Sequence, residues 1–244
     1  MIKVQERDGV TVVALCSGKV NAMDVEMLTG LADCLADLQA AGPGPVVLTG
    51  EGHVFSAGVD LRRVLDGGSA YVDRLMPALS AAFLAVFRFP APTVAAVNGA
   101  AVAGGCVLAC ACDHRVAAAG APIGATELSV GVPFPAAALE VMRYACGNHA
   151  EEVIFGAGLY RGEHAVSRRL IHAVVTGDVV GHAVSAARTM RFSPASTVTK
   201  RQLRQPFVDR AAAAGDEDVR RIWSSAATAG LLREQLQRIR QERR

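Results

Sequence analysis

The sequence predicts an α/β fold, in which strands and helices alternate along the chain. Short apolar runs alternate with longer segments of helical periodicity up to about Val175, and the opening order is strand, strand, helix, strand. No strand pattern appears after Val175. A length of 244 residues suits a single α/β unit. We therefore predict a core over residues 1–193 and a helical region over residues 194–244.

The first part of the chain sets this order. Residues 2–16 are predicted to form two strands joined by an Asp-Gly turn. Apolar residues then recur at helical spacing over residues 25–38, and either Asn21 or Asp24 can cap that helix. A Gly-Pro-Gly-Pro run ends the helix, and residues 46–49 follow as a short buried strand.

The middle of the chain continues the alternation. A helix is predicted over residues 69–89, although Pro77 inside it points to a later start. Residues 93–97 form an apolar strand, and an Asn-Gly turn follows it. A small-residue helix over residues 104–112 and a strand over residues 114–118 complete this part.

Beyond residue 131 the chain is predicted to be mainly helical. Three helices precede a last strand at residues 171–175; they cover residues 136–146, 150–157 and 161–169. A helical pattern then runs from Val179 to the end. Its expected breaks lie at Ser193-Pro194, Pro206, Gly215 and Gly230.

Composition argues against several classes of protein. The net charge of +2 gives no basis for nucleic-acid binding. Six cysteines are expected as buried thiols, and those at positions 106, 110 and 112 lack paired C-x-x-C spacing, so no metal is expected. Residues 1–8 contain no apolar signal core, which favours a cytoplasmic protein.

One uncharged stretch has the length of a membrane span. Thr93–Cys112 carries no charge over about 20 residues. Asn98 and the many glycines and alanines make this stretch only weakly hydrophobic. A buried strand followed by a buried helix explains it better, so we expect no membrane span.

Two glycine-containing segments and one acid point to chemistry. Gly104 and Gly105 lie at a predicted helix N-terminus, where free N–H groups can approach and stabilise a developing oxyanion. Residues 53–61 form a small-residue loop before a helix, which also suits backbone contact with a ligand. Glu127 is the single charged residue between Pro122 and Pro135. An oxyanion-stabilising turn beside an isolated acid is typical of enolate chemistry.

The sequence contains two further motifs, FSAGVDL at Phe55–Leu61 and AAVNGAAVAGGC at Ala95–Cys106. Together they resemble motifs of the crotonase superfamily, the enoyl-CoA hydratase/isomerase family. Ala111–Arg115 and Glu163–Val166 also fit, as does Ser193-Pro194 ahead of the C-terminal helices. The resemblance covers nearly the whole chain, and the two main motifs together make it specific.

The resemblance implies a core of repeated ββα units and C-terminal helices that assemble a homotrimer or a dimer of trimers. It implies an acyl-CoA substrate, no metal and no redox cofactor. The thioester carbonyl would lie between the backbone N–H groups of Val59 and Gly104. The substrate-binding residues it implies are Ala57, Gly58, Asp60, Gly105, Val107 and Phe134.

The acids depart from the hydratase pattern. Family hydratases carry two glutamates, and the first of these positions is Val107 here, while the second is Glu127. This arrangement of acids resembles that of the single-glutamate Δ3,Δ2-enoyl-CoA isomerases. The turn Gly131–Phe134 also resembles a Gly-x-x-x-Pro-Phe turn of those enzymes. We therefore predict an isomerase in which Glu127 moves the proton. An enoyl-CoA hydratase and a non-catalytic acyl-CoA binder remain alternatives, whereas no G-x-S-x-G motif supports a serine hydrolase.

Other charged residues have structural alternatives. Asp60 fits a helix cap as well as a ligand contact. Glu140 lies at helical spacing and is expected to be structural, and Asp113 is expected to order a turn with Arg115. Three basic residues near the predicted start of the C-terminal helices are candidates for the CoA phosphates: Lys200, Arg201 and Arg204.

Overall fold

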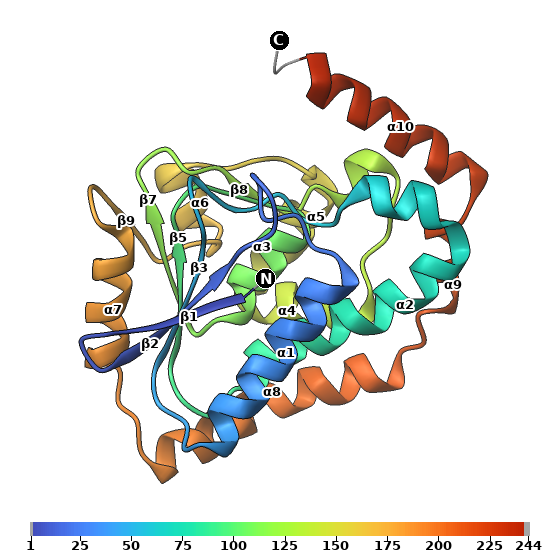
Figure 1. Cartoon of the computed structure of the whole chain (residues 1–244). Helices are drawn as coiled ribbons and strands as arrows, with labels where there is room; N and C mark the ends of the chain where they lie inside the picture. The colour runs from blue at the N-terminus through green and yellow to red at the C-terminus, as the bar shows by residue number, and fades with distance from the viewer. Residues whose placement is uncertain (1, 242–244) are drawn as a thin grey trace.

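The computed structural model describes residues 2–241, which form two sheets and a set of surrounding helices (Figure 1). The larger sheet has six strands in the order β1-β2-β3-β5-β7-β9. Only β1 pairs antiparallel to its neighbour. The strands are β1 (Ile2–Arg7), β2 (Val10–Leu15), β3 (Val46–Gly50), β5 (Thr93–Val97), β7 (His114–Ala118) and β9 (Ala173–Val175). The strands expected between residues 2 and 118 in this sheet are confirmed, and the last one is shorter than predicted.

A second sheet of three parallel strands was not predicted. It consists of β4 (Val54–Ser56), β6 (Ala100–Val102) and β8 (Ile123–Gly124), in that order. Each of these strands directly follows a strand of the larger sheet and leads toward a helix. This is the repeated ββα unit that the family resemblance implies. Strands of two or three residues are too short to show an alternating pattern in the sequence.

The helices follow the predicted order with several changed ends. Asp24 caps α1 by accepting a hydrogen bond from the Met27 N–H at 2.8 Å, so it is the cap and Asn21 is not. The helices are α1 (Val25–Ala40), α2 (Leu61–Arg88), α3 (Gly104–Ala111), α4 (Ala136–Cys146), α5 (Ala150–Gly156), α6 (Gly162–Ser167), α7 (Val179–Thr189), α8 (Pro194–Ala213), α9 (Glu217–Trp223) and α10 (Ala226–Gln241), with short 3-10 turns η1 (Glu127–Val130) and η2 (Gly147–His149).

Helix α2 begins earlier than predicted and continues through Pro77. Gly68, at φ 56°, kinks its first part. By length and composition α2 could cross a membrane, the one such helix among residues 2–241, but half of its most apolar window is buried within the fold. Its Leu75, Phe83 and Phe87 belong to the main core, which accounts for its apolar character. Thr93–Cys112 forms β5, β6 and α3, as expected of a strand and a helix.

The helices cover the two faces of the larger sheet differently. α7 packs on one face in a small separate cluster that includes Val12, Val94 and Ala183 (Figure 1). The main core lies on the other face, among α1, α2, α3 and α4. Pro206 and Gly230 were expected to break helices but lie inside α8 and α10, because tertiary packing offsets their poor helix propensity.

The C-terminal helices contact the core of their own chain. α8 packs against α4, and α10 packs against α2 and η1. α8 begins at Pro194, with Ser193 as its N-cap. Of the six cysteines, four are buried, whereas Cys16 and Cys34 are half-buried, so the expectation of six buried thiols was wrong for these two.

Candidate active site

The small sheet brings the three predicted reactive groups to one edge. β4 ends just before Val59, β6 just before Gly104 and β8 just before Glu127. Because the three strands are parallel, their carboxyl ends lie at the same edge, where ligands bind in open α/β sheets. Neighbouring strands are about 4.8 Å apart, so the three segments that follow them are neighbours in space.

The first loop offers one free amide. Among the described residues, no protein oxygen accepts a hydrogen bond from the Val59 N–H. The three surrounding N–H groups are all occupied: Ala57 donates to Val20 O (3.0 Å), Gly58 to Ser56 Oγ (3.2 Å) and Asp60 to Met23 O (2.9 Å). The loop geometry thus singles out Val59 as a donor for a ligand.

The second loop offers free amides at the start of α3, and that of Gly104 lies directly beside the first loop. Gly104 is the first residue of α3, and its N–H has no acceptor within residues 2–241. Gly58 lies at φ +81°, and a Cβ there would be 2.9 Å from Val102 O and 3.3 Å from Gly104 N. The two loops are therefore in contact. Two free N–H groups on touching loops are suited to bind an oxyanion.

Glu127 is the first residue of η1, and the residue is only 7% exposed. Its Oε2 atom has no hydrogen-bond partner among the described residues. Burial raises the pKa of Glu127 to about 8. The Ala103 N–H donates to Gly124 O at 2.8 Å, so the segment that leads into Glu127 lies beside the second loop. A buried acid with a raised pKa and a free oxygen is suited to proton transfer.

The turn that follows Glu127 is held by backbone contacts and joins the apolar core. Val107 is fully buried in α3, and both Val107 and Phe134 belong to the main core. The Val132 N–H donates to the Glu127 carbonyl at 3.2 Å. The Trp223 indole donates to Pro133 O at 2.9 Å, which fixes the turn after η1. The prediction that Val107 replaces a second acid with a buried apolar side chain is consistent with this packing.

The remaining substrate-binding candidates have different surroundings. Asp60 accepts hydrogen bonds from the Arg62 and Arg63 N–H groups and caps α2. A Cβ on Gly105 would lie 2.4 Å from the Ser56 carbonyl oxygen, so this glycine allows α3 to pack on β4. Ala57 is exposed and Gly58 buried. Val59 and Asp60, which follow, are half-buried.

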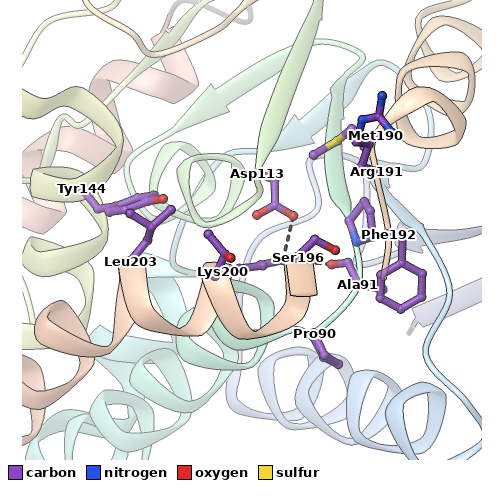
Figure 2. A pocket seen from close by; sticks show the side chains of 12 residues that line it. Pro90, Ala91, Asp113, Tyr144, Met190, Arg191, Phe192, Ser196, Lys200 and Leu203 are labelled. Atoms are coloured by element: carbon purple, nitrogen blue, oxygen red, sulfur yellow. Dashed lines mark hydrogen bonds and ion pairs between the residues drawn. The ribbon is translucent and has the colours of Figure 1, made fainter. Parts of the chain in front are cut away.

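The basic residues of α8 are engaged inside the protein. Asp113 pairs with Lys200 at 2.7 Å and with Arg204 at 2.8 Å. Asp113 and Lys200 lie on the wall of a cavity of about 370 Å³ (Figure 2). These pairs engage both side chains within their own chain, and contact of Lys200, Arg201 and Arg204 with the CoA phosphates, across a subunit boundary or within one chain, stays a prediction. Asp113 does not order a turn with Arg115, whose guanidinium donates to three backbone carbonyls instead. None of the predicted catalytic, oxyanion or acyl-binding residues lines this cavity.

Glu140 is structural, as predicted. It is buried and pairs with Arg143 at 3.1 Å on its own helix and with Arg210 of α8 at 2.7 Å. Both carboxylate oxygens are therefore occupied, in contrast to Glu127. Among residues 2–241, no group of three or more His, Cys, Asp or Glu side chains is arranged to hold a metal ion.

The raised pKa of Glu127 has a consequence for stability. The pKa rises from 4.5 to about 8 on folding, so between these values the unfolded chain releases a proton that the folded chain keeps, and stability falls as pH rises. At pH 7 this difference in the pKa of Glu127 lowers the free energy of unfolding by about 3 kcal/mol. Glu127→Gln removes the titration. We expect the Tm of E127Q, relative to the unchanged protein, to increase from pH 5 to pH 8 and then level off; a Tm difference independent of pH would contradict this.

Comparison with known proteins agrees with the geometry. Residues 5–229 match the family described as enoyl-CoA hydratase/isomerase. The human mitochondrial Δ3-Δ2-enoyl-CoA isomerase structure has a TM-score of 0.91 at 28% identity, covering 99% of this chain and 98% of the other. An enoyl-CoA hydratase structure from Mycobacterium ulcerans has a TM-score of 0.80 at 28% identity, covering 87% and 95%.

Two bacterial sequences have higher identity to this chain but match a smaller part of it. Relatives from Thermus thermophilus and Bacillus subtilis are 37% and 32% identical, and the matches cover 63% and 66% of this chain. They span 62% and 64% of the relatives' own lengths. The match over most of the sequence, the ββα repeats and the paired loops lead to one conclusion: the chain belongs to the enoyl-CoA hydratase/isomerase family.

Proposed function

We propose that this enzyme moves the double bond of enoyl-CoA thioesters from C3 to C2, with Glu127 as its only proton-transferring acid. One observation carries the proposal. The buried edge formed by the small sheet presents a single unpaired carboxyl group, and the position that would hold a second acid is the buried Val107. The full-length similarity to an enoyl-CoA isomerase supports this assignment.

The proposed reaction uses one acid twice. Ionised Glu127 takes a proton from C2 of a 3-enoyl thioester, and the electron pair spreads over the thioester oxygen and the double bond. The N–H groups of Val59 and Gly104 stabilise the negative oxygen. Protonated Glu127 then donates the same proton to C4, and the double bond forms between C2 and C3. Loss of one such donor elsewhere costs about 2.7–4 kcal/mol, so the pair is a large part of the catalysis.

Addition of water is the main competing reaction. Hydration needs one group to align water and another to transfer a proton, and the apolar Val107 can do neither. The test is to incubate the enzyme separately with a 3-enoyl-CoA and a 2-enoyl-CoA. We expect double-bond migration with the first and negligible 3-hydroxyacyl-CoA from the second. Faster hydration than migration would favour the hydratase, and binding without C2 proton exchange in deuterated water would favour a non-catalytic binder.

The pKa of Glu127 predicts how the rate depends on pH. The acid must be ionised to take the first proton, and with a pKa of about 8 only a minor fraction is ionised at pH 7. We expect kcat/KM for migration to rise about tenfold per pH unit below pH 7 and to level off above pH 8. A stopped-flow pH profile of the unchanged enzyme measures this. A profile that is flat between pH 6 and pH 9 would contradict the role of a buried base.

We also propose that the chain assembles as a homotrimer or a dimer of trimers, as the family resemblance implies. α9 and the start of α10 pack on their own chain, while the far end of α10 extends beyond the body of the molecule (Figure 1). Light scattering on the purified protein tests the assembly.

A further inference from the structure

Met23 contacts both loops of the candidate oxyanion site, although it belongs to neither. It lies between β2 and α1, and its side chain is fully buried. Its backbone pairs with Val59 in an isolated parallel bridge. In this bridge the Met23 N–H donates to Gly58 O at 2.8 Å, and the Asp60 N–H donates to Met23 O at 2.9 Å.

The first of these bonds sets the direction of the Val59 N–H. The Gly58 carbonyl and the Val59 N–H belong to one planar trans peptide unit, so they point in opposite directions. Because Met23 holds the carbonyl from one side, the N–H is directed to the other side. The hydrogen bond to the carbonyl also polarises the peptide and strengthens the donor.

The side chain of Met23 acts on the second loop. A Cβ on Gly104 would lie 3.2 Å from the Met23 sulfur, and the ring of Phe83 would be next, at 3.7 Å. The sulfur therefore packs directly against the Gly104 backbone. One residue thus holds the peptide of the first donor with its main chain and supports the second donor with its side chain.

We propose that Met23 is a positioning residue that sets the spacing between the two oxyanion donors. The inference rests on the proposed thioester site but requires no particular reaction there. Shortening the side chain would remove support behind Gly104 and let the two N–H groups move relative to each other. The expected consequence is a weaker hold on the thioester oxygen in the transition state, with less effect on binding of the remainder of the substrate.

The first test measures hydrogen bonding from the two donors to a thioester carbonyl, without turnover. Butanoyl-CoA labelled with ¹³C at its carbonyl is bound to the enzyme, and the carbonyl stretch is measured by infrared difference spectroscopy. Two hydrogen bonds lower this frequency relative to free butanoyl-CoA. We expect Met23→Ala to return the band part of the way toward the free value, and Met23→Leu, which keeps the volume, to restore most of the shift.

Two controls separate this role from general stability and from the proposed reaction. Met27→Ala makes the same truncation at an equally buried residue of α1 and should leave the band unchanged. E127Q should also keep the full shift, whether or not the enzyme is an isomerase. If the unchanged protein shows no shift, the oxyanion site itself is wrong; if M23A keeps the full shift, only the role of Met23 is wrong. Should M23A not fold, the carbonyl band is measured in Met23→Val instead, with the same expected direction of change.

A double-mutant cycle supplies the kinetic test. Gly104→Ala places its Cβ against the Met23 sulfur, and Met23→Ala removes that contact. We expect each single variant to lower kcat about tenfold with little change in KM, a part of the roughly 10²–10³-fold loss that removal of a whole donor causes. The fold-loss of kcat in the double variant should be clearly smaller than the product of the two single fold-losses. Independent, multiplicative losses would overturn the proposal.

Discussion

Replacing Glu127 by glutamine is expected to lower kcat for double-bond migration by at least about a thousandfold, because the amide can neither take nor return a proton. The side chain keeps its size and remains neutral, as the buried acid mostly is at pH 7. Binding of a saturated acyl-CoA should therefore persist within a few-fold. Single-turnover assays with a 3-enoyl-CoA and calorimetric titration with butanoyl-CoA measure the two quantities.

Glu140→Gln is the matched control for this change. Glu140 is as buried as Glu127, but its oxygens pair with Arg143 and Arg210. Its replacement should reduce stability by disturbing the link between α4 and α8, while kcat of the folded protein stays close to its original value. An E127Q variant that keeps more than about a tenth of the original kcat would remove Glu127 from the reaction.

Substitution of Gly58 by alanine is expected to cause the second large loss of activity. The new Cβ would meet Val102 O at 2.9 Å and Gly104 N at 3.3 Å, so it would force the two donor loops apart. We expect kcat to fall by roughly 10²–10³-fold, the loss reported for removal of one oxyanion donor. Steady-state assays at saturating substrate provide the measurement.

Gly120→Ala isolates the part of this effect that belongs to the site. Gly120 has the same φ of +81° as Gly58, but a Cβ there meets nothing within 4 Å. Both substitutions carry a backbone strain of about 1–2 kcal/mol, and only Gly58→Ala adds the collision between the loops. Equal losses of kcat in the two variants would show that backbone strain, and not the contact between the loops, is responsible.

The larger sheet and most helices could be predicted because their signals are local. Apolar residues at helical spacing predict α1, and the apolar run over residues 93–97 predicts β5, whose five residues are all buried. The small sheet could not be found in this way, because its strands have two or three residues and are defined by their partners. Pairing of distant charges is equally hidden: Asp113 and Lys200 are 87 positions apart.

The candidate site also combines features that are visible in the sequence with features that only the fold defines. Glycines at a turn and a lone acid among apolar residues are visible in the sequence, and the family resemblance assigns Val59 and Gly104 to one site. The structure adds what a pattern cannot contain. The Val59 N–H stands out because the N–H groups of Ala57 and Asp60 donate to Val20 and Met23, and that of Gly58 donates to Ser56 within the loop. Met23 carries no sequence signal at all, since its contribution comes from a backbone bridge and from the position of its sulfur.

The transfer of a labelled proton tests the one-acid mechanism most directly. A 3-enoyl-CoA carrying deuterium at C2 is converted in ordinary water under single-turnover conditions, and the label in the product is located by NMR. If Glu127 carries the proton from C2 to C4 faster than the proton exchanges with water, a measurable part of the deuterium appears at C4. Product whose C4 hydrogen comes entirely from water, formed at the full rate, would contradict the account.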